Sequence, residues 1–201
     1  MKDTTTSVQP LIDYFEKMIS LNKAEKELIE KKFQIHLYLK RQFALQQGDV
    51  CEYFNFVVRG CLRLYKVDAS GALHVLEFAS ENYWIVDLHS FHTKKPAAFN
   101  IDALEDTVVL RVSQADLVDI YLTEPIFNRI FRVLVENHFI GQQQRIGQLF
   151  SSTAEERYEL FMETYPHLIN RIPQVQIASY LGITPEFLSR IRSRRARAEK
   201  S

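Results

Sequence analysis

A segment of 20 residues near the end of the chain, 174–193, constrains the possible folds more than any other feature. Its apolar residues recur at helical spacing on both sides of a glycine, at Ile177, Leu181, Ile183, Leu188 and Ile191. Gly182 tolerates the positive φ that a tight turn between two helices requires. Ala178 is small at the point where two crossing helices would approach each other closely. The pattern predicts a helix-turn-helix.

The second helix of this pair has its start signals in order. Thr184 is suited to the N-cap, Pro185 to the first helical position and Glu186 to the positive end of the helix. With Leu188 and Ile191 facing inward, a rotation of about 100° per residue places four side chains on the opposite face. These outward residues are Glu186, Ser189, Arg190 and Ser193.

The outward face has the chemistry of a DNA reader. A carboxylate accepts a hydrogen bond from the cytosine amino group, and an arginine bridges guanine O6 and N7. We therefore expect these four residues to contact bases. The phosphate contacts, which add affinity without sequence information, are expected from Thr184, Arg192, Arg194, Arg195, Arg197 and Lys200. An ordinary helical hairpin, or a surface helix without a ligand, remains the alternative.

The distribution of charge along the chain agrees with DNA binding, although the net charge of the whole chain does not. The chain has 25 Lys and Arg against 25 Asp and Glu, so its net charge is zero. Residues 171–201 carry seven basic and two acidic side chains, whereas residues 1–170 carry an excess of acidic ones. This asymmetry indicates a short basic end for nucleic acid on an acidic body, or else a solvated basic tail.

The remainder of the chain divides by hydrophobic period. Residues 8–33 repeat at helical spacing, whereas 34–112 form short β-rich runs punctuated by Gly48, Gly60 and Gly71. Many short strands at regular spacing predict a sandwich or barrel. We expect a further helix from Thr153, its N-cap, to about Tyr165.

Residues 125–149 predict a long helix with apolar side chains on too much of its circumference for a surface helix, among them Phe127, Ile130, Phe131, Leu134 and Phe139. We expect it to lie against the β-domain on one side and against its own copy in a dimer on another. A purely intramolecular core helix is the alternative. The expected domains are a sensor domain (1–124), a dimerisation helix (125–150) and a DNA-binding domain (151–201).

On these residues the chain resembles the Crp/Fnr transcription regulators over about residues 10–193. The resemblance rests on the spacing of LQQGDVCEYFNFVVRGCLRLYKVDASGALHVLEF and on QIASYLGITPEFLSRI, where Glu186 and Arg190 match the base-contacting pair of the family. It implies an α+β fold with an N-terminal β-roll or jelly roll of the cyclic-nucleotide-binding type. It further implies a cytoplasmic homodimer that binds a two-fold-related site on double-stranded DNA, with RNA polymerase as a further partner.

The sequence departs from the family in three places. Cyclic-AMP-binding relatives have a Gly-Glu pair and an Arg-Ser pair, where this chain has Val86-Asp87 and Ala97-Ala98. Without a cation for the phosphate, we expect no tight cyclic-nucleotide binding at these four residues, and the effector is unknown. The cysteine cluster of iron–sulfur relatives is absent, so no cofactor is expected. The wing that usually follows the second helix is truncated or missing, and we expect the basic residues 194–201 to replace its phosphate contacts.

A cupin-like metalloenzyme is the rival from another class. Its metal would need a close pair of histidines, a carboxylate and a third histidine. His89 and His92 are close in sequence, but the other histidines are scattered. Cys51 and Cys61 are interpreted as reduced packing residues. We expect neither a metal site nor an enzyme, and the sequence shows no secretory signal or membrane span.

Overall fold

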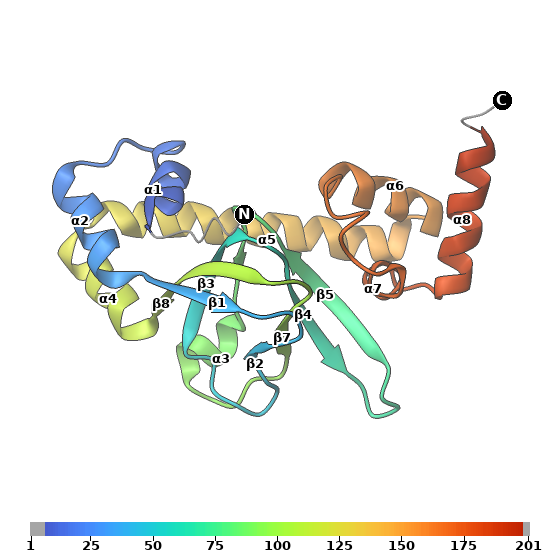
Figure 1. Cartoon of the computed structure of the whole chain (residues 1–201), viewed down its shortest axis with the longest axis horizontal. Coiled ribbons are helices and arrows are strands. Elements are labelled where there is room, and N and C mark those ends of the chain that lie inside the picture. Colours follow the sequence, from blue (N-terminus) through green and yellow to red (C-terminus); the bar gives the residue numbers. More distant parts are fainter. Residues whose placement is uncertain (1–6, 199–201) are drawn as a thin grey trace. The chain divides into compact units, whose positions relative to one another are not determined.

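The computed structural model describes residues 7–198, which form two compact units (Figure 1). The first unit comprises the chain up to Lys66 together with Leu76–Glu136, and the second comprises Val67–Val75 and the chain from Asn137 onward. The boundary at residue 136 lies inside the long helix. That helix therefore contributes to both units, and the division into domains 1–124, 125–150 and 151–201 stays a prediction.

The first unit contains two antiparallel four-stranded sheets, ordered β1-β8-β3-β6 and β2-β7-β4-β5. The strands are β1 (Gln34–Tyr38), β2 (Phe43–Leu45), β3 (Tyr53–Arg59), β4 (Leu62–Val67), β5 (Leu73–Ala79), β6 (Trp84–Ile85), β7 (Asn100–Ala103) and β8 (Thr107–Ser113). The three glycines expected at turns, Gly48, Gly60 and Gly71, all have positive φ. At Gly60 the chain also passes so close to Thr107 that a Cβ would lie 2.5 Å from Oγ1 of that threonine. The prediction of an α+β fold with a β-roll is confirmed.

Short helices complete this unit, and side-chain hydrogen bonds cap the starts of three of them. They are α1 (Gln9–Glu16), α2 (Lys23–Lys32), α3 (Leu88–Thr93) and α4 (Gln114–Thr123). Asn22 and Glu25 form a reciprocal capping box at the start of α2. Ser113 caps α4 through the N–H of Asp116. An aromatic core joins the helices to the sheet, since Trp84 contacts the rings of Phe15, Phe56 and Phe131.

The long helix α5 (Ile126–Ser151) begins in this aromatic core. Three of the five residues expected to mark a dimer surface, Phe127, Ile130 and Phe131, are instead only 1%, 2% and 3% exposed within the single chain. Leu134 packs partly against the same core, and only Phe139 remains largely exposed. The first turns of the helix therefore belong to the core of the first unit, and the dimer surface stays a prediction.

The second unit is built from α6 (Ala154–Thr164), α7 (Gln174–Leu181) and α8 (Pro185–Ala198). Thr153 caps α6, as predicted, in a reciprocal box with Glu156. Residues Val67–Val75 also pack in this unit. The hydroxyl of Ser179 on α7 donates to the carbonyl oxygen of Leu73 at 2.6 Å and accepts from the N–H of Val75 at 2.9 Å.

Two features of the described residues bear on the rival interpretations. Within residues 7–198, no helix combines the length and the hydropathy needed to cross a bilayer. In the same part of the chain, no three His, Cys, Asp or Glu side chains gather as a metal ion would require. Cys51 and Cys61 are buried and form no disulfide with each other, and burial raises the pKa of the Cys51 thiol, which disfavours the reactive thiolate.

Candidate nucleic-acid interface

The predicted helix-turn-helix is present as α7, a tight turn and α8. Gly182 ends α7 in the left-handed conformation, with φ of 69°. The N–H of Ile183 then donates to the carbonyl oxygen of Ala178 at 3.0 Å, which closes the turn. The hydroxyl of Thr184 accepts from the N–H of Phe187 at 3.2 Å, so it caps α8, which begins at Pro185 as predicted.

The apolar positions of the motif hold the two helices together. Ile177, Ala178 and Leu188 have no exposed surface, and Leu181 and Ile191 are nearly as buried. Because Ala178 has only a methyl group, α7 can approach α8 closely at this point. The inward side of α8 is therefore fixed, and its opposite side faces solvent.

The four residues predicted to contact bases all lie on this exposed side of α8: Glu186, Ser189, Arg190 and Ser193. The guanidinium of Arg190 lies 5.2 Å from the centre of the Phe187 ring, which supports the side chain without removing its hydrogen-bond donors. Hydrogen bonds from the start of the helix and from Thr184 lower the pKa of Glu186, so this group is a carboxylate acceptor at neutral pH. Ser193 already donates to the carbonyl oxygen of Ser189, at 2.9 Å.

The residues expected to contact phosphates differ from one another in their partners and in their exposure to solvent. Arg194 forms an ion pair with Glu155 at 3.6 Å, and Arg195 contacts the sulfur of Met162 at 3.3 Å. Arg192 is half-buried, whereas Arg197 is exposed. Since an exposed ion pair contributes only about 0–1 kcal/mol, Arg194 can exchange its partner for a phosphate at little cost. Lys200 lies outside the described residues.

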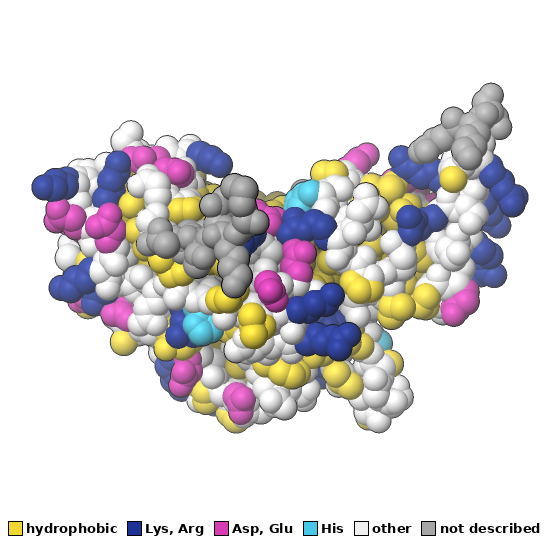
Figure 2. All heavy atoms as spheres, viewed as in Figure 1, with side chains coloured by type: hydrophobic (Ala, Val, Ile, Leu, Met, Phe, Trp, Pro, Cys, Tyr) yellow, Lys and Arg dark blue, Asp and Glu magenta, His cyan; other side chains and the backbone are white. Residues whose placement is uncertain are grey.

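Basic side chains nevertheless follow α8 along most of its length, as Figure 2 shows. The residues expected to form a basic tail continue this helix as far as Ala198. They therefore keep a defined helical spacing relative to Glu186 and Arg190. A helix with acceptor and donor groups in its first turns and cations beyond them can read bases and bind phosphates at the same time.

Two arginines that position the motif had no signal in the sequence. Arg157 on α6 donates through Nε to the carbonyl oxygen of Leu181 at 3.1 Å, and Arg145 on α5 donates to that of Tyr180 at 3.0 Å. Arg145 also lies 4.0 Å above the Tyr180 ring. Both cations satisfy carbonyl groups at the C-terminal end of α7, where the helix dipole favours positive charge.

The residues considered as an effector pocket are engaged in contacts within the chain. The carboxylate of Asp87 is buried and accepts from the N–H groups of Ser90 at 3.0 Å and Ala98 at 3.2 Å. Ala97 is buried, Val86 packs against the core and Ala98 is exposed. Asp87 therefore already bridges the two segments that a nucleotide would have to contact, which makes it a structural N-cap for α3.

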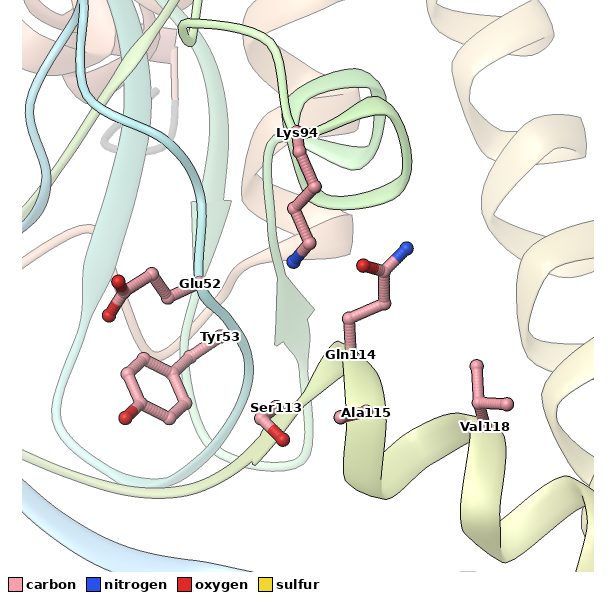
Figure 3. A pocket seen from close by; sticks show the side chains of 7 residues that line it. All are labelled: Glu52, Tyr53, Lys94, Ser113, Gln114, Ala115 and Val118. Carbon is pink, nitrogen blue, oxygen red and sulfur yellow. The ribbon is translucent and has the colours of Figure 1, made fainter.

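A pocket of about 620 Å³ lies elsewhere in the first unit (Figure 3). It is formed at the start of β3, the end of α3 and the start of α4, by Glu52, Tyr53, Lys94, Ser113, Gln114, Ala115 and Val118. None of the four residues expected to form an effector pocket contributes to it.

Comparison with known proteins places this architecture. Residues 35–124 match the sequence family of the cyclic nucleotide-binding domain. Among solved structures, FixK2 from Bradyrhizobium japonicum is similar with a TM-score of 0.71 and 20% identity, over 81% of this chain and 83% of that one. The c-di-GMP responsive global regulator CLP of Xanthomonas campestris is similar with a TM-score of 0.70 and 12% identity, over 89% and 93%.

The catabolite activator protein of Thermus thermophilus is also similar, with a TM-score of 0.56 and 19% identity, over 90% of this chain and 87% of that one. No curated protein sequence matches the chain. The Xanthomonas protein is described as a global regulator and the Thermus protein as an activator.

The architecture shared with these structures is a β-roll followed by a long helix and a helix-turn-helix. Residues 35–124 match the cyclic nucleotide-binding domain family, and the chain shares its overall fold with solved structures that include a regulator described as of the Crp/Fnr family. The resemblance inferred from the sequence is confirmed.

Proposed function

We propose that this protein is a sequence-specific DNA-binding transcription regulator that acts as a homodimer. The observation that carries the proposal is the exposed face of α8, where Glu186 and Arg190 stand beside each other on a helix whose inner face is fully packed. Their donor and acceptor groups match the edge of a G·C pair in the major groove. The basic residues further along the helix supply charge for the phosphate backbone.

Dimerisation is supported by the second half of α5. Val135, Phe139, Ile146 and Leu149 are four, seven and three residues apart, a spacing that aligns them along one seam of a helix. All four are more than 40% exposed, and Phe139 reaches 60%. A second copy of the same helix, packed in parallel, covers such a seam with identical side chains and brings two recognition helices to a two-fold-related DNA site.

The test is selection of bound DNA from a random pool, first with the natural protein and then with Arg190→Ala. We expect a palindromic consensus for the natural protein. Loss of one bidentate arginine should relax a single base pair in each half-site, by about 1–3 kcal/mol of discrimination. The other positions of the consensus should keep their preference.

Arg197→Ala is the matched control, because Arg197 lies on the same helix beyond the base-reading face. It should weaken binding to all sequences alike and reduce the salt dependence by about one phosphate contact. If Arg190→Ala also weakens all sequences alike, Arg190 contacts a phosphate and the assignment of base readout is wrong. If no consensus emerges at all, the proposed function fails.

A second candidate keeps the DNA-binding role but adds a small-molecule effector other than cyclic AMP. The Xanthomonas neighbour is described as responsive to c-di-GMP, so a protein with this fold can respond to a different ligand. The closed turn around Asp87 argues against cyclic-nucleotide binding at the position that the family uses. An effector of this chain would therefore need another site on the β-roll.

A further inference from the structure

Two arginines in the two sheets of the β-roll have contrasting partners. On β4, Arg63 is buried and donates from Nε and a terminal nitrogen to the two carboxylate oxygens of Asp102, at 2.6 and 2.7 Å. On β8, Arg111 has no carboxylate partner among the described residues. Its guanidinium forms a hydrogen bond with the Tyr38 hydroxyl, and its Nε is buried without a hydrogen-bond partner. Nothing in that part of the chain neutralises Arg111.

The surroundings of Arg111 are polar and aromatic. Strand register places Asn55 of β3 and Gln34 of β1 directly beside it. Its guanidinium carbon lies 4.0 Å from the centre of the Tyr53 ring, which holds the side chain in one direction. The hydroxyl of Tyr38 donates to Asn55 at 3.4 Å, and the ring of His36 lies 4.5 Å from that of Tyr38.

The residues of this cluster differ in their exposure to solvent. Tyr38 and Asn55 are 4% and 2% exposed, whereas His36, Tyr53 and Arg111 are partly open to solvent. Burial and the charge of Arg111 lower the pKa of His36, so the cluster carries a positive charge from Arg111 and contains several hydrogen-bond donors. Tyr53 also forms a wall of the neighbouring pocket in Figure 3, into which Lys94 extends, so solvent reaches this side of the roll.

We propose that Arg111, with Tyr38, Tyr53 and His36, forms a binding site for a small oxyanion, either a carboxylate or a phosphate. The planar guanidinium presents parallel N–H groups that match two oxygens of either anion. Charge-assisted hydrogen bonds of this kind are stronger than hydrogen bonds between neutral groups. The anion would accept from the guanidinium N–H groups of Arg111, which have no carboxylate partner among the described residues. The site lies on the sheet β1-β8-β3-β6, apart from the segment around Asp87. The proposal concerns binding by the β-roll and does not depend on DNA recognition.

The experiment titrates the full chain with inorganic phosphate and, separately, with succinate, by calorimetry at constant ionic strength. We expect at least one of the two anions to bind, and Arg111→Gln to weaken that binding at least tenfold. Arg111→Lys keeps the positive charge but loses the parallel N–H groups of the guanidinium and its contact with the Tyr53 ring. Its affinity should therefore lie between those of the Arg111→Gln variant and the natural protein. Arg59→Gln, at the far end of β3, is the matched control and should leave binding unchanged.

The two anions distinguish the source of the ligand group. Binding of phosphate alone supports a phosphorylated ligand, and binding of succinate alone supports a carboxylate. In both cases the His36 ring resonances of the natural protein should shift during the titration, and this measurement does not require a variant to fold. If neither anion binds, if Arg111→Gln binds as well as the natural protein, or if the His36 resonances stay fixed, the site is overturned. If the DNA selection gave no consensus sequence, that result would contradict the proposed function but not this binding site.

Discussion

The two halves of α5 have similar apolar compositions but opposite environments. Phe127, Ile130 and Phe131 in the first half lie in the aromatic core of the β-roll unit. Phe139, Ile146 and Phe150 in the second half are exposed, and Phe150 reaches 88%. Hydrophobic period alone cannot separate the two halves, because both present apolar residues at helical spacing. What separates them is whether the same chain supplies a surface to cover them.

The largest expected effect lies in the first half. Phe131→Ala should reduce the free energy of unfolding by about 3–5 kcal/mol, because it leaves a cavity among packed aromatic rings. Phe131 lies 5.4 Å from Trp84, the only tryptophan of the chain, so urea unfolding can be followed by its fluorescence. Phe150→Ala is the control from the second half, and it should change the stability by less than about 0.5 kcal/mol. Equal losses for the two variants would contradict the division of the helix.

The second prediction concerns association. Phe139→Asp should weaken the dimer by about 3 kcal/mol, or about a hundredfold in Kd, because it places a charge in the centre of an apolar seam. Sedimentation equilibrium over a range of protein concentrations measures the change. Leu122→Asp, which alters an even more exposed apolar residue on α4, should leave the dimer intact. A stable dimer of the Phe139 variant would show that the seam does not carry the interface.

The smallest expected effect comes from a glycine in the second half. In Gly141→Ala the added Cβ would meet no atom within 4 Å, and Gly141 lies outside the predicted seam. Removing a helical glycine should stabilise the chain by about 0.5–1 kcal/mol and raise Tm by about 1–4 °C. Calorimetry detects the shift. A fall in dimer affinity would mean that the interface includes this side of the helix and is wider than the seam.

Local signals were sufficient for much of the fold. The caps at Thr153 and Thr184, the left-handed Gly182 and the buried positions of the helix-turn-helix each depend on a few neighbouring residues, so their patterns predicted them directly. The exposed face of α8 could be predicted from its buried face, since the helical repeat determines both. This is why all four residues expected to contact bases are exposed on one helix.

The sites that depend on distant residues could not be predicted in this way. The sequence offered Asp87 as a residue able to accept from a ligand, but the fold brings the N–H of Ala98 to its carboxylate. It also gave no indication that Arg157 would reach the carbonyl of Leu181, or that Arg111 would stack on Tyr53 without a carboxylate partner. Pairings of this kind join residues from separate elements, and no spacing along the chain encodes them.

The sequence by itself therefore determined the order of the elements, the helix-turn-helix and the exposed face of α8 that we propose as the DNA-reading surface, because helical period and capping act over a few residues. Only the tertiary structure decided which half of α5 is core, whether the segment around Asp87 is open, and which arginine of the β-roll is left without a counter-ion. Burial and charge pairing depend on every element that packs nearby, and those neighbours are set by the fold as a whole.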